Sequence, residues 1–354
     1  MTDLLARTAE LVDIPSVSHA EQAITDRIEA ELRAAPWLTV DRIGNNVIAR
    51  TSLDRPMRIV IAGHTDTVPV NDNDRARIEG DTLWGLGSAD MKSGLAVMIE
   101  LATTIDTPAI DVTYVFYAGE EIASEHNGLG HVLRDRPELL QGDVAILGEP
   151  TDAVLEAGCQ GTLRLDVTLT GVRAHSARPW MGRNAIHRLG RLLTILDGWE
   201  GRRPVVDGCE YREAVQAVLV EGGIAGNVVP DRARVLIDHR FAPDRDEASA
   251  EAWLRELIAP MLEEGDTAVI LDSAAGARPG LDHPIFAALV ARNGLEVRAK
   301  LGWTDVARFS ALSMPAVNLG PGDPLLAHTA DEHVTRGQLD RTWAILRDLL
   351  VNEI

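Results

Sequence analysis

Hydrophobic residues in the first 150 positions follow two kinds of spacing. Short apolar stretches, which predict buried strands, lie at residues 47–50, 58–63, 112–118 and 144–147. Apolar residues three or four apart predict helices at 3–14, 21–34 and 91–105, and around residues 131–133. The helix at 91–105 is apolar on every side, so we expect it to be buried against a sheet. Strands that alternate with helices predict an α/β fold with a doubly wound, largely parallel sheet.

The pattern changes at Leu163, where apolar and polar residues begin to alternate as in an antiparallel strand with one solvated face. The elements predicted next are a helix at 184–196, strands at 215–220 and 234–240, a helix at 247–262 and a strand at 268–271. This β-α-β-β-α-β order is that of a ferredoxin-like α+β unit. After Pro284 the first pattern returns, with helices at 284–292, 305–312 and 337–352 and strands at 295–300 and 316–319. We therefore expect a small lid or dimerisation domain, residues 161–272, inserted into a domain formed by residues 1–160 and 273–354.

Acidic residues and histidines follow the strands of the first domain. They are His64, Asp66, Asp90, Glu120, Glu121 and Glu149, and His328 lies in a late loop. Because ligands of open α/β sheets gather at the carboxyl ends of the strands, these groups are expected to converge in one crevice. So many carboxylates would repel one another unless a cation lay between them. Taken singly, Asp90 could instead cap a helix, Glu120 and Glu121 could form a solvated turn, and Glu149 could be an exposed loop acid.

Composition narrows the choice of ligands and partners. The net charge of −20 disfavours nucleic acid and anionic membranes as partners. The N-terminus lacks the pattern of a signal peptide and no apolar run approaches a membrane span, so we expect a cytoplasmic protein. Cys159 and Cys209 form no C-x-x-C pair, so any metal should be held by histidines and carboxylates. The remaining histidines, among them His19, His126 and His131, are predicted to be structural.

Several short motifs resemble those of the dinuclear-zinc aminoacylase and carboxypeptidase superfamily. They are Gly63–Val68, Gly85–Lys92, Gly119–Glu121, Gly148–Thr151 and the late His328. A narrower group is most similar to the succinyl-diaminopimelate desuccinylases, particularly the actinobacterial ones, and comprises Cys159–Thr162, Gly226–Pro230, His239–Pro243 and Gly302–Phe309. The resemblance covers nearly the whole chain.

The resemblance implies a role for each matching residue. It makes Asp90 the bridge between two zinc ions, with His64 and Glu149 completing one site and Glu121 and His328 the other. It makes Asp66 a support for His64, and Glu120 the general acid/base. It implies that His175 reaches the active site of the partner subunit in a homodimer, and that Asn227 and Arg240 bind substrate. Cobalt or manganese could replace zinc at such a site.

The resemblance implies an amidohydrolase that cleaves N-succinyl-LL-2,6-diaminopimelate to succinate and LL-2,6-diaminopimelate, in the synthesis of lysine and cell-wall precursors. One departure is Gln160, since other desuccinylases carry arginine near this position; Arg178 or Arg308 could bind the succinyl carboxylate instead. The alternatives within enzymes are an N-acetylornithine deacetylase or another deacylase, and a dipeptidase. A metal-stabilised amino-acid-binding protein without turnover is the alternative from another class, although a binder has no need of Glu120 beside the metal.

Overall fold

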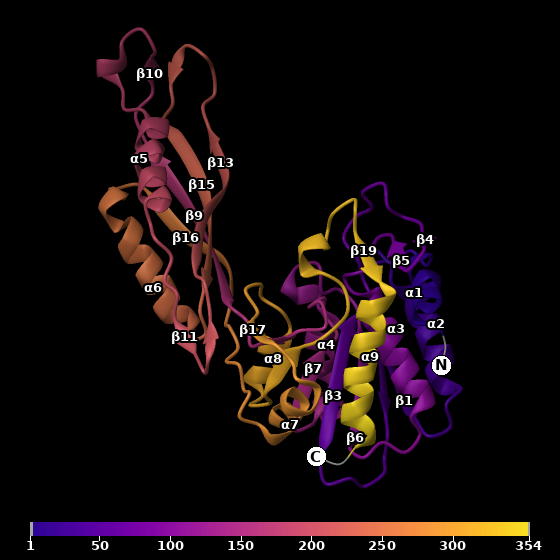
Figure 1. Cartoon of the computed structure of the whole chain (residues 1–354). Helices are drawn as coiled ribbons and strands as arrows, with labels where there is room; N and C mark the ends of the chain where they lie inside the picture. Colours follow the sequence, from indigo (N-terminus) through magenta and orange to yellow (C-terminus); the bar gives the residue numbers. More distant parts are fainter. Residues whose placement is uncertain (1–2, 353–354) are drawn as a thin grey trace. The chain divides into compact units, whose positions relative to one another are not determined.

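The computed structural model describes residues 3–352, which divide into two compact units. Unit 1 comprises residues 3–158, 279–298 and 305–352, and unit 2 comprises residues 159–278 and 299–304. Figure 1 follows the chain through both units. Within the described residues, no helix is both long and apolar enough to cross a membrane.

Unit 1 is built on a mixed, largely parallel sheet in the order β1-β2-β6-β3-β7-β18-β8-β17. Its strands are β1 (Thr39–Ile43), β2 (Asn46–Arg50), β3 (Arg58–His64), β6 (Asp111–Tyr117), β7 (Val144–Leu147), β8 (Leu155–Ala157), β17 (Val297–Ala299) and β18 (Ala316–Asn318). Strand β3 pairs in parallel with β6 and β7, and β18 pairs in parallel with β7. The predicted doubly wound α/β sheet is therefore confirmed, with β1, β2 and β8 as antiparallel additions.

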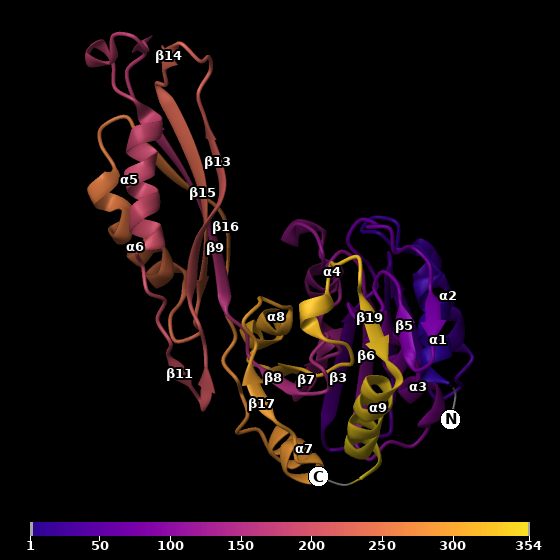
Figure 2. The ribbon, with the colours of Figure 1, turned by 45° about the horizontal axis from the view of Figure 1, so that its top comes forward.

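Helices cover both faces of this sheet (Figures 1 and 2). They are α1 (Leu4–Val12), α2 (Gln22–Arg33), α3 (Lys92–Thr104), α4 (Gly128–Asp135), α7 (Pro284–Asn293), α8 (Val306–Ala311) and α9 (Arg336–Val351). Helix α3 contacts β3 and β6, and its residues 92–102 are all buried, as its apolar sequence predicted. Helix α4 contacts β2, and α8 contacts β7 and β18. A small second sheet joins β4 (Arg77–Glu79), β5 (Thr82–Trp84) and β19 (His333–Thr335).

Unit 2 has the predicted β-α-β-β-α-β order. Its main elements are β9 (Gly161–Thr170), α5 (Ala185–Asp197), β13 (Ala214–Gly222), β15 (Arg232–Phe241), α6 (Glu247–Ile258) and β16 (Thr267–Ala274). The four strands form an antiparallel sheet in the order β13-β15-β9-β16. Leu163, Leu165, Val167 and Leu169 of β9 belong to one core with α5 and α6. Two short pairs complete the unit, β10 (Ala174–His175) with β14 (Val228–Val229) and β11 (Val205–Val206) with β12 (Cys209–Glu210).

A buried ion pair fixes α5 to the end of the sheet in unit 2. Arg188 of α5 donates to both carboxylate oxygens of Asp266, at 2.8 and 2.6 Å, and both side chains are nearly inaccessible. The main-chain N–H groups of Thr170 and Glu263 also donate to Asp266. Burial opposes the charge of Asp266, but these hydrogen bonds outweigh it and hold the pKa of its carboxyl well below the usual range.

Candidate metal centre

The first predicted ligands meet at the end of β3. His64 is the last residue of this strand and is almost completely buried. Its Nε2 lies 3.0 Å from Oδ1 of Asp90. Asp90 does not cap α3, because Met91 is the N-cap residue and the helix has no side-chain capping bond. The geometry thus disfavours the alternative in which Asp90 only caps a helix.

Asp90 also faces the late histidine. Nε2 of His328 lies 3.6 Å from Oδ2 of Asp90 and 3.0 Å from Oε1 of Glu121. The two oxygens of Asp90 therefore face two different histidines. Ligand atoms of His64, Asp90 and Glu121 all lie within 4.8 Å of one another, as a metal site requires.

Asp66 organises the segment that carries the two glutamates. Its Oδ1 accepts from the N–H of Glu120 at 3.0 Å, and its Oδ2 accepts from the N–H of Glu121 at 3.1 Å. Ser18 Oγ donates to Oδ2 at 2.7 Å. Nδ1 of His64 lies 3.0 Å from the main-chain oxygen of Asp66 and 3.6 Å from its carboxylate, so the carbonyl is the nearer acceptor.

Of the two remaining acids, Glu120 is partly buried and Glu149 is buried. Glu149 is 5% exposed, which excludes the alternative of an exposed loop acid. Burial raises the pKa of Glu120 well above its usual value, and the charges of Glu149 and Glu121 add to this effect while His64 opposes it. The side chain of Glu121 is only 9% exposed, so Glu120 and Glu121 do not form a solvated turn.

Excess negative charge also acts on the histidines. The hydrogen bond with Glu121 raises the pKa of His328 to about 9 against the effect of burial. Burial lowers the pKa of His64, but contacts with Asp66 and Asp90 and the charge of Glu149 outweigh it and raise this pKa well above its usual value. Each imidazole thus lies in a field that stabilises a positive charge. Two imidazoles and several carboxylates are ligands that suit zinc and similar divalent ions, so this donor set fits such metals.

Glu332 is a residue of this centre that sequence reasoning missed. It is buried, and its carboxylate accepts from three main-chain N–H groups, those of Gly87 at 3.0 Å and of Ala89 and Asp90 at 2.9 Å. Burial raises the pKa of Glu332 to about 7 although these hydrogen bonds lower it. Lys92 lies on the same segment and its Nζ donates to the main-chain oxygen of Ile14 at 2.8 Å. The segment that presents Asp90 is thus anchored by residues that lie far from it in the sequence.

Comparison with known proteins identifies the family. The sequence pattern of peptidase family M20/M25/M40 matches residues 60–352. The chain belongs to this family. It is 44% identical, over 98% of its length and 96% of the relative, to the succinyl-diaminopimelate desuccinylase of Corynebacterium glutamicum. It is 52% identical, over 98% of both chains, to a Mycobacterium tuberculosis H37Rv protein provisionally given the same name.

The fold of this M20 chain also matches solved structures. The Bacillus subtilis YXEP protein, described as a dinuclear metal-binding peptidase of the M20 family, aligns with a TM-score of 0.73 at 16% identity. The match covers 98% of this chain and 96% of that one. At this identity the likeness establishes the shared fold alone.

The other predicted site residues of the M20 chain lie apart from this cluster in the sequence. His175, Arg178 and Asn227 come together in unit 2: His175 pairs with Val228 between β10 and β14, and its main-chain oxygen accepts from the N–H of Arg178. All three are exposed. Arg240, on β15, donates to Asp238 at 2.9 Å. Arg308 belongs to unit 1.

Arg308 is already held by neighbours. Its guanidinium pairs with the buried Asp305 and donates to Ser124 Oγ at 2.8 Å. Asp305 also accepts from the side-chain amide of Asn127 at 2.9 Å. A role for Arg308 in binding a substrate carboxylate would require it to share the guanidinium with Asp305.

Proposed function

We propose that the protein is a metal-dependent amide hydrolase that removes the succinyl group from N-succinyl-LL-2,6-diaminopimelate, a cytoplasmic step in lysine and diaminopimelate synthesis. The metal dependence is supported by the position of Asp90, because one of its carboxylate oxygens faces His64 and the other faces His328. The substrate assignment is supported by the 44% identity, over nearly the whole chain, to a named desuccinylase.

The proposed ligands divide into two sets around Asp90. His64 and Glu149 would hold one ion, and Glu121 and His328 the other, with Asp90 shared between them. We propose zinc as the native metal, with cobalt or manganese as substitutes. Two such ions, when bound, polarise an amide carbonyl and lower the pKa of the attacking water.

Glu120 is the proposed general acid/base. Its carboxyl is buried beside Glu149 and Glu121, which raises its pKa and so its affinity for a proton. In this role Glu120 takes a proton from the attacking water and delivers it to the nitrogen of the leaving amine. The hydrogen bonds from its own N–H and that of Glu121 to Asp66 hold the segment in place while the proton moves.

His175 is the proposed donor to the oxyanion. The N–H of Ala177 donates to Nδ1 of His175 at 3.0 Å. Nδ1 must then be unprotonated, so the neutral ring carries its proton on Nε2, and the side chain is exposed. An Nε2–H donor of this kind can stabilise the negative oxygen of a tetrahedral intermediate, an effect often worth about 10²–10³-fold.

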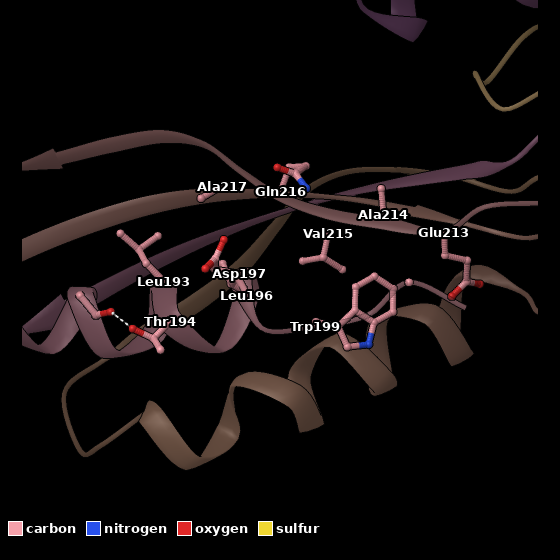
Figure 3. Close-up of a pocket in the computed structure, with 12 residues that line it drawn as sticks. Leu193, Thr194, Leu196, Asp197, Trp199, Glu213, Ala214, Val215, Gln216 and Ala217 are labelled. Carbon is pink, nitrogen blue, oxygen red and sulfur yellow. Dashed lines mark hydrogen bonds between the residues drawn. The ribbon is translucent and has the colours of Figure 1, made fainter. Parts of the chain in front are cut away.

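We further propose that two chains pair through unit 2. Strand β13 is an edge strand, and its Val218, Leu219 and Val220 are 55%, 37% and 53% exposed. A groove of about 630 Å³ lies beside it, between Leu193 and Thr194 of α5 and Val215–Ala217 of β13 (Figure 3). Exposed apolar edge strands are usually covered. A second copy of the same strand would pair with it in a two-fold, self-complementary contact.

The test of the function is a substrate panel read by amine release. N-succinyl-LL-2,6-diaminopimelate, its N-acetyl analogue, N-acetylornithine and a dipeptide are compared on enzyme with a measured metal content. We expect the highest kcat/KM for the succinyl compound, because paired arginine–carboxylate bonds select an acyl group that ends in a carboxylate. Arg178, Arg240 and Arg308 are the candidates for that contact.

Other results of the substrate panel would contradict parts of the proposal. Equal kcat/KM for the succinyl and acetyl forms would disprove the carboxylate preference, and a preference for N-acetylornithine or the dipeptide would identify a sister activity. Metal without turnover of any compound would indicate a binding protein. Active protein without a transition metal would disprove the metal-dependent mechanism.

A further inference from the structure

A second cluster of histidines lies outside the proposed centre. A pocket of about 440 Å³ in unit 1 is lined by three histidines: His19, which precedes α2, His126 of the 3₁₀ helix Ser124–His126, and His131 of α4. The rings of His19 and His126 have centroids 5.0 Å apart and an interplanar angle of 82°. Both side chains are exposed, so a solute ion can reach them.

The distance between the two ring centroids is compatible with a shared metal ion. Imidazole nitrogens bind zinc at about 2.0–2.1 Å in a tetrahedral arrangement, which places two bound rings roughly 5 Å apart between centroids. The third histidine of the pocket, His131, lies in α4, and its Nε2 is 2.8 Å from the main-chain oxygen of Glu125. It is available as a further ligand if that contact is exchanged.

The charges around the pocket favour a cation. The carboxylate of Glu125 lies 3.5 Å from Nε2 of His126, and Asp135 lines the pocket. The buried Glu21 also lines it and accepts from the N–H of His19 at 2.8 Å. No arginine or lysine is among the residues that line this pocket. Asp135 is itself paired with Arg134, so the negative charge that favours a cation over an anion comes from Glu21 and Glu125.

We propose that His19 and His126 form a peripheral transition-metal site, separate from the centre around Asp90. The expected ligands are borderline divalent ions such as zinc, copper and nickel, because imidazole suits these ions better than magnesium or calcium. Water, or His131 after release of Glu125, completes the coordination.

The site is placed to affect catalysis. Ser18, next to His19, donates to Asp66, and the N–H groups of Glu120 and Glu121 donate to the same carboxylate. His126 ends the segment that begins with these glutamates. An ion held by His19 and His126 would tie together two segments that already meet at Asp66, so we expect excess metal to slow turnover. This consequence rests on the proposed function, whereas the binding itself does not.

The binding test counts ions on metal-loaded protein. Wild type, His19→Gln, His126→Gln and the exposed control His187→Gln are dialysed against excess zinc, and bound zinc is measured by elemental analysis. We expect each pocket variant to hold one ion fewer than wild type, and His187→Gln to hold the wild-type number. Because the replaced rings are exposed, the variants should keep the wild-type melting temperature. Either pocket variant alone is enough to test the site. Equal counts in all four proteins would overturn the site.

The regulatory consequence has its own readout. Initial rates are measured against added zinc, with basal activity expected to be unchanged in the pocket variants. Inhibition of wild type and of His187→Gln, but not of the pocket variants, supports the coupling; equal inhibition of all four overturns it. A failed dinuclear centre would change the total count but not the difference between wild type and pocket variants, so the two proposals fail separately.

Discussion

Two carboxylates near the proposed metal centre hold main-chain segments in place. Asp66 accepts hydrogen bonds from the segment of Glu120 and Glu121, and Glu332 accepts three from the segment of Asp90. Neither carboxylate needs to touch a metal to influence its binding, since residues that orient ligands commonly change metal affinity or activity by about 10–100-fold.

Replacing Glu332 should therefore weaken metal binding without removing a ligand. In Glu332→Gln one carboxylate oxygen becomes an NH₂ group that faces an N–H donor, so at least one of the three hydrogen bonds is lost. We expect metal affinity to fall by about 10–100-fold, measured by titrating metal-free protein. The exposed Glu10→Gln is the control and should bind as wild type does. Unchanged affinity in Glu332→Gln would show that the Asp90 segment holds its shape without this carboxylate.

Replacing Glu120 should slow turnover without changing metal binding. Glu120→Gln keeps the size of the side chain but cannot accept a proton, so kcat should fall by about 10²–10⁴-fold while metal content stays at the wild-type level. Elemental analysis and steady-state kinetics on one preparation measure both. Loss of metal in parallel with activity would instead make Glu120 a ligand.

His328→Ala removes a proposed ligand of one metal position. It should lower the occupancy of that position more than the occupancy of the other, which elemental analysis measures.

At the level of elements, unit 2 depends on how α5 is attached to its sheet. The buried pair of Arg188 and Asp266 makes this attachment, and breaking such a pair by removing one partner typically costs about 3–5 kcal/mol. The outer edge of β13, in contrast, has apolar side chains that are not covered within the unit. We expect the first feature to govern the stability of the unit and propose that the second governs its association.

The pair of Arg188 and Asp266 should make the unit sensitive to acid. The pKa of Asp266 is lower in the folded state than the usual value of about 3.9, so its contribution is complete above that value and is lost as the pH falls toward the folded pKa. The protection of the α5 amides, which is the intrinsic exchange rate divided by the observed rate at the same pH, should fall in wild type below about pH 4. Asp266→Asn should have lower protection than wild type at neutral pH, and its protection should change less with acid. Asp272→Asn, on the exposed part of β16, should behave as wild type does.

The edge of β13 should decide the association state. Val220→Lys places a charge on the proposed pairing edge, which should separate the two chains. Val269→Lys is the matched control, because Val269 is equally exposed, at 53%, on β16 at the opposite edge of the same sheet. Sedimentation equilibrium should give a lighter species for Val220→Lys only. Dissociation by Val269→Lys, or by neither variant, would place the contact elsewhere.

At the scale of the whole molecule, the proposed active site requires residues from both units. His175 lies in unit 2, whereas Glu120 and the proposed ligands lie in unit 1. The family resemblance implies that His175 acts on the partner subunit, and domain closure is a common way to complete a catalytic site. A donor used mainly in the transition state lowers kcat and kcat/KM together when it is removed.

This arrangement predicts complementation between two inactive proteins. His175→Ala should keep its metal and lose kcat, and Glu120→Gln should be inactive for the reason given above. A mixture that exchanges subunits should regain activity, because each heterodimer then contains one site with both residues intact. If labelled subunits demonstrably exchange and no activity returns, His175 does not act across the dimer.

The sequence by itself determined the course of the chain and the kind of chemistry. The apolar stretch that ends at His64, the apolar helix that follows Asp90 and the alternation after Leu163 all became the elements that their spacing predicted. Strands β4, β5 and β19 were missed, because each has a single aliphatic residue between polar or aromatic ones and so gives no apolar stretch. These features are local, and local spacing is what a sequence records directly.

Tertiary structure alone decided which groups meet. Glu332 reaches the segment of Asp90 across 242 positions and binds its main-chain N–H groups, which leave no pattern in side-chain identity. The ring centroids of His19 and His126 lie 5.0 Å apart, although nothing in the sequence around either residue links the two segments. The main-chain oxygen of Asp66, rather than its carboxylate, became the nearer acceptor for His64. Such contacts depend on where the sheet brings distant loops together, because main-chain groups are the same in every residue and only the fold gives them a direction.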